Sequence, residues 1–266
     1  MVYHEGDKSV RRSDLIGRPP IVLFSADEMR LVTGEPAMRR KWMDRILSQE
    51  NQDYLLRLKR YTRTLEERNI LLRYSETGSP DPGSLLAVDE TLAADGNVIL
   101  DARKKFINDV MNVLPTKLTS LGCQHLSARI KLELVETAAS KDLLSALIDS
   151  RYKDLAAGHT TVGPHRDDIR FLDLQPDRPA LPAPDILSQG EIRILSLALK
   201  CIEADRLAAE SQSPTLLVDD LFSELDDTRR AAVSAFLRDY RGQVLLTACI
   251  APPVDLLSNI QHHITF

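Results

Sequence analysis

Cysteine is scarce in this sequence of 266 residues, and its pattern argues against two kinds of stabilised fold. The three cysteines, Cys123, Cys201 and Cys249, lie far apart and form no CxxC pair. This spacing speaks against a disulfide framework and against a zinc site, and it fits a reducing cytoplasm. No apolar run approaches the ~20 residues of a membrane-spanning helix, and the polar N-terminal residues lack the apolar core of a signal peptide. We expect a cytoplasmic protein that does not contact a membrane.

Glycine is also scarce, with 11 residues, and the glycine-containing motifs of several enzyme classes are missing. The sequence has no GxSxG elbow, no dinucleotide-binding fingerprint and no phosphate-binding GxxxxGK[ST] loop, and it has no HExxH zinc motif. The six histidines are dispersed apart from a terminal pair, so we expect no metal site built from His and Cys. The remaining composition, 43% hydrophobic and 27% charged, is typical of a folded globular chain.

The net charge of −5 conceals one basic segment. Residues 39–73 contain ten Lys or Arg and five Asp or Glu, so this segment carries +5 and the rest of the chain carries −10. A basic helical surface of this kind can bind phosphates. A solvated helix with ion pairs between residues i and i+4 explains the same composition and is the simpler interpretation.

Apolar runs and helical periodicity predict an α/β architecture in the second half of the chain. One amphipathic helix follows Ser188 and another follows Asp226, and each is followed by a short apolar run typical of a buried strand. A similar run precedes Phe24. Strand, helix and strand in this order indicate a parallel sheet. The expected strands are PPIVLF at 19–24, TLLVDD at 215–220 and QVLLTACI at 243–250.

The middle of the chain predicts a helical hairpin or arm. A long helical pattern begins at Glu35-Pro36 and a second one near Asp101, with the polar stretch 75–84 between them. After Gly158, two short β segments are expected around a Gly-Pro turn. The helix positions expected to be buried are Tyr54, Leu58, Tyr61, Leu65, Phe106, Val110, Val113 and Leu118.

Two adjacent acids, Asp219 and Asp220, stand at the carboxyl end of a predicted strand, where α/β sheets place their ligands. One carboxylate can hold a hydrated magnesium ion, and its neighbour can accept a hydrogen bond from an attacking water. Acids also end many strands without a chemical role, so this motif alone leaves both interpretations open.

A second motif, Leu187-Ser188-Gln189-Gly190-Glu191, opens the helix before that strand. A serine and a glycine at a helix start present a hydroxyl, free backbone N–H groups and the positive end of the helix dipole, which together suit a phosphate. Ser188 and Glu191 also have the spacing of a capping box, so a well-capped helix explains the same residues.

The order of these motifs resembles the ATP-binding-cassette heads of SMC-like DNA repair ATPases, and more narrowly the RecF family. The resemblance covers nearly the whole chain. It rests on residues 22–44, on YLLRLKRYTRTLEERNILLR (54–73), VGPHRDDIRF (162–171), LSQGEIRILSLALK (187–200) and LLVDDLFSELDD (216–227). It implies an α/β ATP-binding-cassette head with an inserted, mainly α-helical arm. The implied division is 1–34 as part of a first ATPase lobe, 35–158 as the arm and 159–266 as the lobe that carries the motifs.

The resemblance also implies a role for each motif. Asp219 would be the Walker B acid linked to Mg²⁺, and Asp220 would orient the water. Asp226 would belong to the D-loop, and the turn Ser25-Ala26-Asp27 occupies the place of the Q-loop without its glutamine. The signature motif would touch the γ-phosphate of ATP held by the partner subunit of an ATP-dependent homodimer; it comprises Ser188, Gln189, Gly190 and Glu191. The candidate DNA-binding residues are Arg39, Arg40, Lys59, Arg60, Arg63 and Arg166.

Two departures from the family pattern affect the expected function. Thr247 is followed by Ala248-Cys249-Ile250, where the family usually has a threonine-rich turn and an acid, so we expect an altered end of the ATP site. The family's phosphate-binding loop, which lies near the N-terminus, has no counterpart in this sequence. We therefore expect the chain to begin inside the first lobe and to lack autonomous ATPase activity.

Three hypotheses for function remain. In the first, the chain is part of a RecF-type protein that binds single-stranded or gapped DNA in an ATP-dependent manner during replication-linked repair, with recombination mediator proteins as partners. In the second, it is a truncated, ATP-independent module that binds DNA or a partner through the arm. In the third, the truncated product does not fold, because removal of a strand exposes a sheet edge.

Overall fold

A computed structural model describes residues 3–5, 8–10, 20–74, 81–138, 142–210, 213–222 and 225–249. Two compact units are present. The first comprises residues 1–34, 110–131 and 171–266, and the second comprises 35–109 and 132–170. In the described part of the chain, none of the helices has the length and hydropathy that crossing a membrane requires. The division into 1–34, 35–158 and 159–266 stays a prediction.

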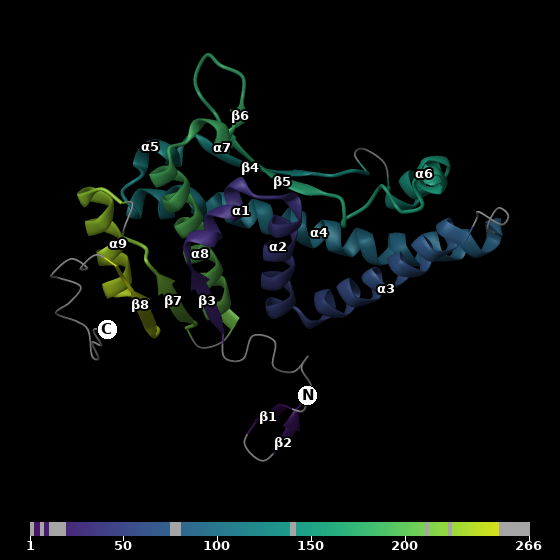
Figure 1. Cartoon of the computed structure of the whole chain (residues 1–266), viewed down its shortest axis with the longest axis horizontal. Helices are drawn as coiled ribbons and strands as arrows, with labels where there is room; N and C mark the ends of the chain where they lie inside the picture. The colour runs from purple at the N-terminus through teal and green to yellow at the C-terminus, as the bar shows by residue number, and fades with distance from the viewer. Residues whose placement is uncertain are drawn as a thin grey trace. The chain divides into compact units, whose positions relative to one another are not determined.

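The first unit is built on a parallel three-stranded sheet (Figure 1). β7 (Thr215–Asp219) lies in the centre and pairs in parallel with β3 (Ile21–Phe24) and β8 (Val244–Thr247). α8 (Gln189–Glu210) precedes β7, and α9 (Asp227–Asp239) connects β7 to β8. The α/β class and the three strands expected from the apolar runs are confirmed.

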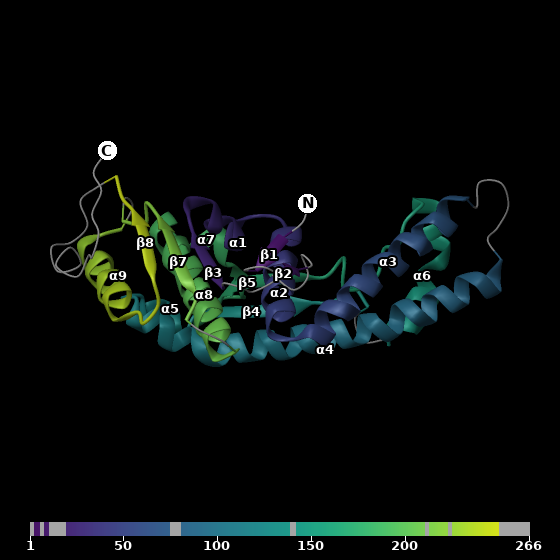
Figure 2. The same cartoon turned by 90° about the horizontal axis from the view of Figure 1, so that it is seen from below.

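One face of this sheet is covered by helices. Side chains alternate along a strand, so Val22, Phe24, Leu216 and Val218 share a face. All four are buried, and α8 packs against β3. The connections from β3 to β7 and from β7 to β8 advance in the same direction across the sheet. Because crossovers between parallel strands are right-handed, α8 and α9 cover the same face. Figure 2 shows both helices on one side of the strands.

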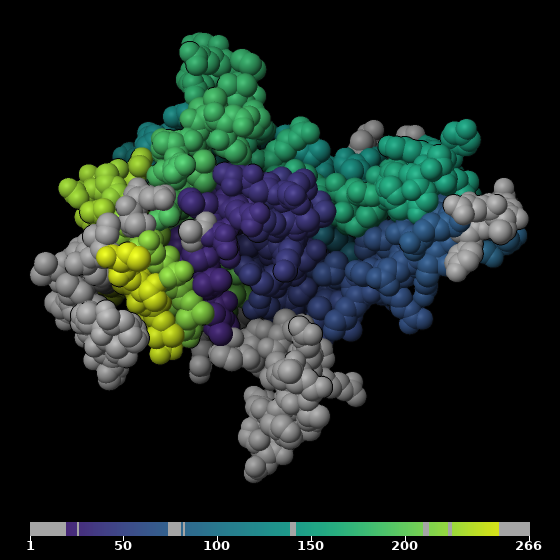
Figure 3. Space-filling view, in the orientation of Figure 1, coloured from purple at the N-terminus to yellow at the C-terminus, as the bar shows by residue number. Residues whose placement is uncertain are grey.

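The opposite face is apolar and exposed. Ile21, Leu23 and Leu245 are 49%, 42% and 53% exposed, and Leu217 lies between Leu23 and Leu245 in the strand register. Figure 3 shows β3, β7 and β8 side by side at the surface. Parallel sheets are nearly always covered on both faces, because their strands carry apolar residues on each side. The described residues of the first unit leave this second face open.

A buried lysine holds the turn that follows β3. Lys200 of α8 lies 2.6 Å from Oε2 of Glu28 and 3.1 Å from Oε2 of Glu203. Glu28 belongs to the 3₁₀ turn η2 (Ala26–Met29), which leads into α1 (Arg30–Thr33). The charged network therefore holds the turn at the expected Q-loop position against α8. The smaller elements of this unit are β1 (Tyr3–Glu5), β2 (Lys8–Val10), α5 (Gln124–Ser127), β6 (Leu181–Pro182) and α7 (Ala183–Ile186).

The second unit is mainly helical. It contains α2 (Pro36–Glu50), α3 (Gln52–Tyr74) and α6 (Leu143–Ala157). Three elements contribute residues to both units: α4 (Pro82–Ser120), β4 (Ile130–Val135) and β5 (Asp168–Asp173). β4, β5 and β6 form a separate sheet in that order.

The long helix expected from residue 36 is in fact two helices. Asn51 separates them, and its side chain accepts hydrogen bonds from the backbone N–H groups of Asp53 (2.8 Å) and Tyr54 (3.2 Å). Asparagine in this position caps a new helix, so α3 begins afresh. Of the seam predicted along α3, the two tyrosines are buried and the two leucines are partly buried.

The second long helix, α4, begins at Pro82 rather than near Asp101. Gly96 lies within this helix. A side chain at Gly96 would meet Cδ2 of Leu143 at 2.2 Å, so glycine allows α6 to approach closely. Val113 was expected in the core but is 40% exposed, since the buried stripe advances by four residues from Val110 to Leu114 and Leu118. Other members of this stripe are Leu85, Leu92, Ile99 and Phe106. Residues 75–80 of the expected connector lie outside the described part.

Only the second of the two β segments expected around the Gly-Pro turn forms. Residues 160–167 are turns, and their N–H groups bond to side chains instead of a neighbouring strand. The N–H of Thr160 donates to Asn69 (2.7 Å), and that of Thr161 donates to Asp154 (2.9 Å). These local partners replace the ladder that β pairing would supply. β4, in contrast, has no counterpart among the predicted elements.

Candidate ATP site of the first unit

Asp219 lies at the carboxyl end of β7, exposed and in register with Thr247 of β8. The hydroxyl of Thr247 donates a hydrogen bond to the carboxylate of Asp219. The two side chains place oxygen atoms together at the edge where parallel sheets bind ligands. Hard oxygen donors of this kind suit Mg²⁺. Among the described residues, no group of three or more His, Cys, Asp or Glu side chains is arranged to hold a metal ion by itself.

Asp220 adopts an uncommon backbone conformation directly after β7. Its φ angle is +45°, in the left-handed region that few residues other than glycine enter. Its N–H donates to the carbonyl of Thr247 (3.1 Å), and its Oδ1 accepts from the N–H of Cys249 (3.2 Å). Such a conformation persists only where the surroundings enforce it. Thr247 and Cys249 thus hold Asp220 in place.

Ser188 and Glu191 form the predicted capping box at the start of α8. The Ser188 hydroxyl donates to Oε2 of Glu191 (2.7 Å) and accepts from the Glu191 N–H (3.3 Å), and the Ser188 N–H donates to the same Oε2 (2.8 Å). Oε1 of Glu191 lies 2.7 Å from Nε2 of His125. Partial burial raises the pKa of Glu191, but the bonds from His125 and Ser188 outweigh it and lower the pKa to about 2. Ser188 and Gln189 are exposed, and Gly190 is partly buried.

Arg193 connects the two motifs. It lies near the start of α8, is nearly buried, and donates through Nη1 to the carbonyls of Asp220 (3.2 Å) and Leu221 (3.3 Å). The start of α8 is therefore bound to the turn that follows the paired acids. The predicted motifs lie at the same end of the first unit.

Asp226 caps α9. Its Oδ1 accepts from the N–H of Arg229 (2.9 Å), and its Oδ2 lies 3.3 Å from the Arg229 guanidinium. The first two positions of the expected D-loop, Ser223 and Glu224, lie outside the described residues. Asp226 thus sets where the segment after the paired acids becomes helical.

Asp226→Ala is expected to lower the free energy of unfolding by about 1 kcal/mol, because an N–H of the first turn loses its acceptor. Urea denaturation followed by circular dichroism measures this change. Asp239→Ala, at the last residue of the same helix, is the control; removal of an acid from a helix C-terminus is expected to be neutral or slightly stabilising. Equal losses in both variants would contradict the capping role.

Two of the candidate DNA-binding arginines are used inside the second unit. Arg39 forms a two-pronged ion pair with Asp168 through Nε (2.7 Å) and Nη2 (2.9 Å), and it is largely buried. Arg40 donates to the carbonyl of Asp167 (2.7 Å). Burial lowers the pKa of Arg40, and the neighbouring Arg103 adds to this effect. These guanidinium groups anchor the turn before β5.

The other candidates lie at the surface of the second unit. Arg60 pairs with the buried Asp95, and Arg63 pairs with Glu67 one helical turn on (3.0 Å). Lys59 is exposed. Arg166 is exposed and donates to the carbonyl of Thr160 (3.4 Å). The i,i+4 pairing expected as the simpler interpretation of the basic segment is present in the Arg63–Glu67 pair.

Comparison with known proteins places these motifs in a family. No family model matches the chain. The DNA replication and repair protein RecF of Lactococcus lactis subsp. cremoris (strain SK11) is 36% identical over 227 residues, which are 84% of this chain and 60% of that relative. RecF of Thermomicrobium roseum is 34% identical over an alignment of 269 positions, which covers 93% of this chain and 67% of the relative. The chain belongs to the RecF family.

Solved structures agree with this assignment. A structure of the recombination mediator protein RecF with ATP matches with a TM-score of 0.80 at 26% identity, over 94% of this chain and 68% of that one. A second RecF structure, with ATPrS, matches with a TM-score of 0.73 at 28% identity, over 89% and 64%. The chain thus shares the RecF fold and spans about two thirds of the RecF length.

The GPHRDD element of this RecF-family chain is a structural turn. Gly163 has a φ of +129°, and a side chain there would meet the hydroxyl of Tyr61 at 2.7 Å. Nε2 of His165 lies 3.1 Å from the Thr160 carbonyl, which can only accept, so Nε2 carries the proton. Nδ1 then accepts from the Tyr61 hydroxyl (2.8 Å). Arg103, nearly buried, donates to the carbonyl of Pro164 (2.6 Å).

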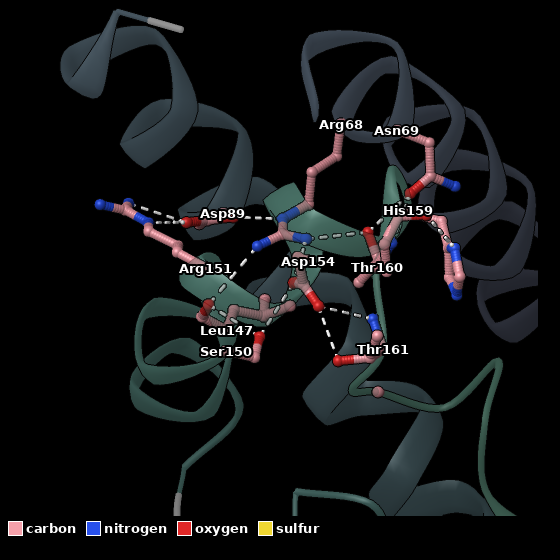
Figure 4. Close-up of polar contacts among 12 residues, drawn as sticks. Arg68, Asn69, Asp89, Leu147, Ser150, Arg151, Asp154, His159, Thr160 and Thr161 are labelled. Carbon is pink, nitrogen blue, oxygen red and sulfur yellow. Dashed lines mark hydrogen bonds and ion pairs between the residues drawn. The ribbon is translucent and has the colours of Figure 1, made fainter. Parts of the chain in front are cut away.

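Arg68 and Asn69, which lie in the segment 54–73 that carries the resemblance, belong to a buried polar network (Figure 4). Arg68 is fully buried and donates to Asp89 (2.6 Å), Asp154 (2.6 Å) and Thr160 (2.9 Å). Asn69 accepts two hydrogen bonds from Thr160. The network joins α3, α4 and α6 to the turn that precedes the GPHRDD element, so this motif supports the second unit.

Sequence reasoning missed two residues that organise the site. Arg193 carries a detectable signal, because it is a charged residue on the apolar side of an amphipathic helix. His125 carries none, since it stands 66 residues from its partner Glu191 in the chain. Only the fold brings these two side chains together.

Proposed function

We propose that this chain supplies the signature and Walker B portion of a RecF-type protein that binds DNA in an ATP-dependent manner during replication and repair. The observation that carries this proposal is the attachment of the signature helix to the turn of Asp220 through Arg193. ATP-driven pairing of two heads requires the signature serine and the paired acids to keep a fixed relation, because each meets a different nucleotide. The membership in the RecF family supports the same function.

The open face of the sheet supports the docking of a further lobe. Its apolar side chains need a cover, and Asp219 alternates onto the same face as Leu217. A lobe packed there would bring its phosphate-binding loop next to Asp219. The chain spans 60% of the Lactococcus relative, so the relative has residues to supply such a lobe. In this proposal, ATP binding depends on that lobe, and the chain alone has no ATPase activity.

The residues at the carboxyl edge fit the remaining parts of an ATP site. Asp219, with Thr247 beside it, would hold Mg²⁺, which when bound would neutralise phosphate charge. Asp220 would orient a water molecule. The exposed Ser188 and Gln189 would meet the nucleotide of a partner subunit in an ATP-dependent homodimer.

Two of the candidate DNA-binding arginines are not available to phosphates. Arg39 and Arg40 are engaged with an acid and a carbonyl of the second unit, whereas Arg60 and Arg63 stay at the surface. We propose that single-stranded or gapped duplex DNA, and any recombination mediator protein, bind the complete ATP-bound dimer. Lys59 and Arg166 remain exposed candidates for contacts with DNA.

The test is to co-express this chain with the part of Thermomicrobium roseum RecF that has no counterpart in it, and to measure binding of the pair to gapped DNA. ATP is expected to raise the DNA affinity at least tenfold, which corresponds to ~1.4 kcal/mol. Ser188→Arg and Asp219→Asn are each expected to remove this response, because the first blocks the partner nucleotide and the second loses the magnesium ligand.

Gln52→Arg is the matched control, since it adds the same positive charge at an exposed position of α3. The pair that carries it is expected to respond to ATP as the wild type does. DNA affinity that is strong in this chain alone, falls steeply with salt and ignores ATP would favour the ATP-independent module instead.

A further inference from the structure

The end of α4 is sharply defined and lies in the first unit. Gly122 has a φ of +76°, and the N–H of Cys123 donates to the carbonyl of Leu118 (2.8 Å). A left-handed glycine with this bond terminates a helix at a fixed residue. A side chain on Gly122 would lie 3.5 Å from Cβ of Ala232, in ordinary contact with α9. The direction in which the chain leaves α4 is therefore fixed, and α5 begins at Gln124.

The first residues after α4 contact both elements that carry the proposed dimer surface. His125 reaches Glu191 at the start of α8, and the buried Cys123 is hydrogen-bonded to Arg229, whose backbone N–H is capped by Asp226 at the start of α9. A single residue, Gln124, thus separates a contact with the D-loop helix from a contact with the signature helix. α4 itself also runs through the second unit.

The geometry of Glu191 gives His125 a specific role. One carboxylate oxygen faces His125 and the other holds both the N–H and the hydroxyl of Ser188. The carboxylate is planar and rigid, so fixing one oxygen fixes the other. An exposed ion pair contributes only about 0.2–1 kcal/mol to stability, and His125 is half exposed. The contact is therefore better suited to setting a position than to stabilising the fold.

We propose that His125 is a positioning residue for the signature motif: it orients Glu191, Glu191 orients Ser188, and the serine is thereby tied to the end of α4. This inference rests on the proposed role of the signature motif in binding ATP. A displacement at the end of α4 would reach the hydroxyl that is meant to meet a phosphate. Glu191 is well suited to this task because its lowered pKa keeps it an ionised acceptor near neutral pH.

The test measures amide hydrogen exchange by NMR at Ser188 and Glu191 in the 266-residue chain without nucleotide. His125→Ala is expected to speed exchange at these two amides about fivefold or more, as the loss of ~1 kcal/mol from a charged hydrogen bond implies. The rest of α8 and the overall stability are expected to change little. His125→Gln, which keeps a donor, is expected to restore most of the protection.

His159→Ala is the matched control, because His159 is an exposed histidine whose ring bonds only locally to the Ala157 carbonyl in the structure. Exchange at Ser188 that stays within twofold of the wild type in His125→Ala overturns the inference. So does faster exchange spread evenly along α8, which would indicate a general structural role.

The same variants can be co-expressed with the phosphate-loop lobe, which is the part of Thermomicrobium roseum RecF that has no counterpart in this chain. This experiment separates the inference from the proposed function. If the wild-type pair dimerises with ATP, the His125→Ala pair is expected to need at least fivefold more ATP than the wild type. The His125→Gln pair is expected to need less ATP than the His125→Ala pair. A wild-type pair that never dimerises with ATP contradicts the proposed function, while the exchange result still decides whether His125 positions Ser188.

Discussion

Arg68→Met is expected to lower the free energy of unfolding by about 3–5 kcal/mol, because it leaves the buried Asp154 without its cation and Asp89 with Arg151 alone. Arg68 lies between Asp89 and Asp154, and all three side chains are fully buried. Methionine fills a similar volume but offers no hydrogen-bond donor to either acid or to Thr160. Urea denaturation monitored by circular dichroism measures the loss.

Two comparisons isolate the cause. Arg63→Met removes an exposed ion pair with Glu67 from the same helix and is expected to cost less than about 0.5 kcal/mol. Adding Asp154→Asn to Arg68→Met removes the orphaned charge, so this double variant is expected to recover part of the lost stability. A loss below about 1 kcal/mol in Arg68→Met would show that the buried network does not hold the second unit together.

Between pH 7.5 and pH 5, the wild-type protein is expected to lose about 2 kcal/mol more stability than His165→Gln. Burial lowers the pKa of His165 from 6.5 to about 4, and the nearby charges of Arg166 and Arg40 contribute. The unfolded chain therefore binds a proton in this range that the folded chain rejects. The stability from this group is complete above pH 6.5 and is lost as the pH falls from 6.5 toward 4.

The measurement is the difference in pH slope between variant and wild type, since other groups titrate in both. His159→Gln serves as the control, because it makes the same substitution at an exposed histidine. A His165→Gln slope equal to that of the wild type would mean that His165 accepts a proton in the folded protein as easily as in the unfolded chain.

Local patterns in the sequence predicted the sheet of the first unit and the start of α8. The three strands are short apolar runs, and Ser188 with Glu191 has the spacing of a capping box; both signals come from residues close in the chain. The start of α4 was predicted near Asp101, whereas the helix begins at Pro82 and includes Gly96, which tertiary packing against Leu143 requires.

Long-range pairing could not be predicted in the same way. Arg39 looks like a phosphate ligand in a count of basic residues, yet its partner Asp168 stands 129 residues away and neutralises it. The same holds for His125 and Glu191. A sequence shows which side chains are charged, but only the fold shows which charges face each other. The candidate site could thus be located by its motifs, while the residues that position it could not.

The most direct test of the account is the binding of the phosphate-loop lobe to this chain. Titration calorimetry measures it with the part of Thermomicrobium roseum RecF that has no counterpart in this chain. Leu245→Glu places a charge on the open face, where 53% exposure lets the chain fold unchanged, and is expected to weaken binding at least tenfold. Ile148→Glu, an exposed position on α6, is expected to bind as the wild type does. Equal affinity of Leu245→Glu and the wild type would show that the lobe does not dock on this sheet.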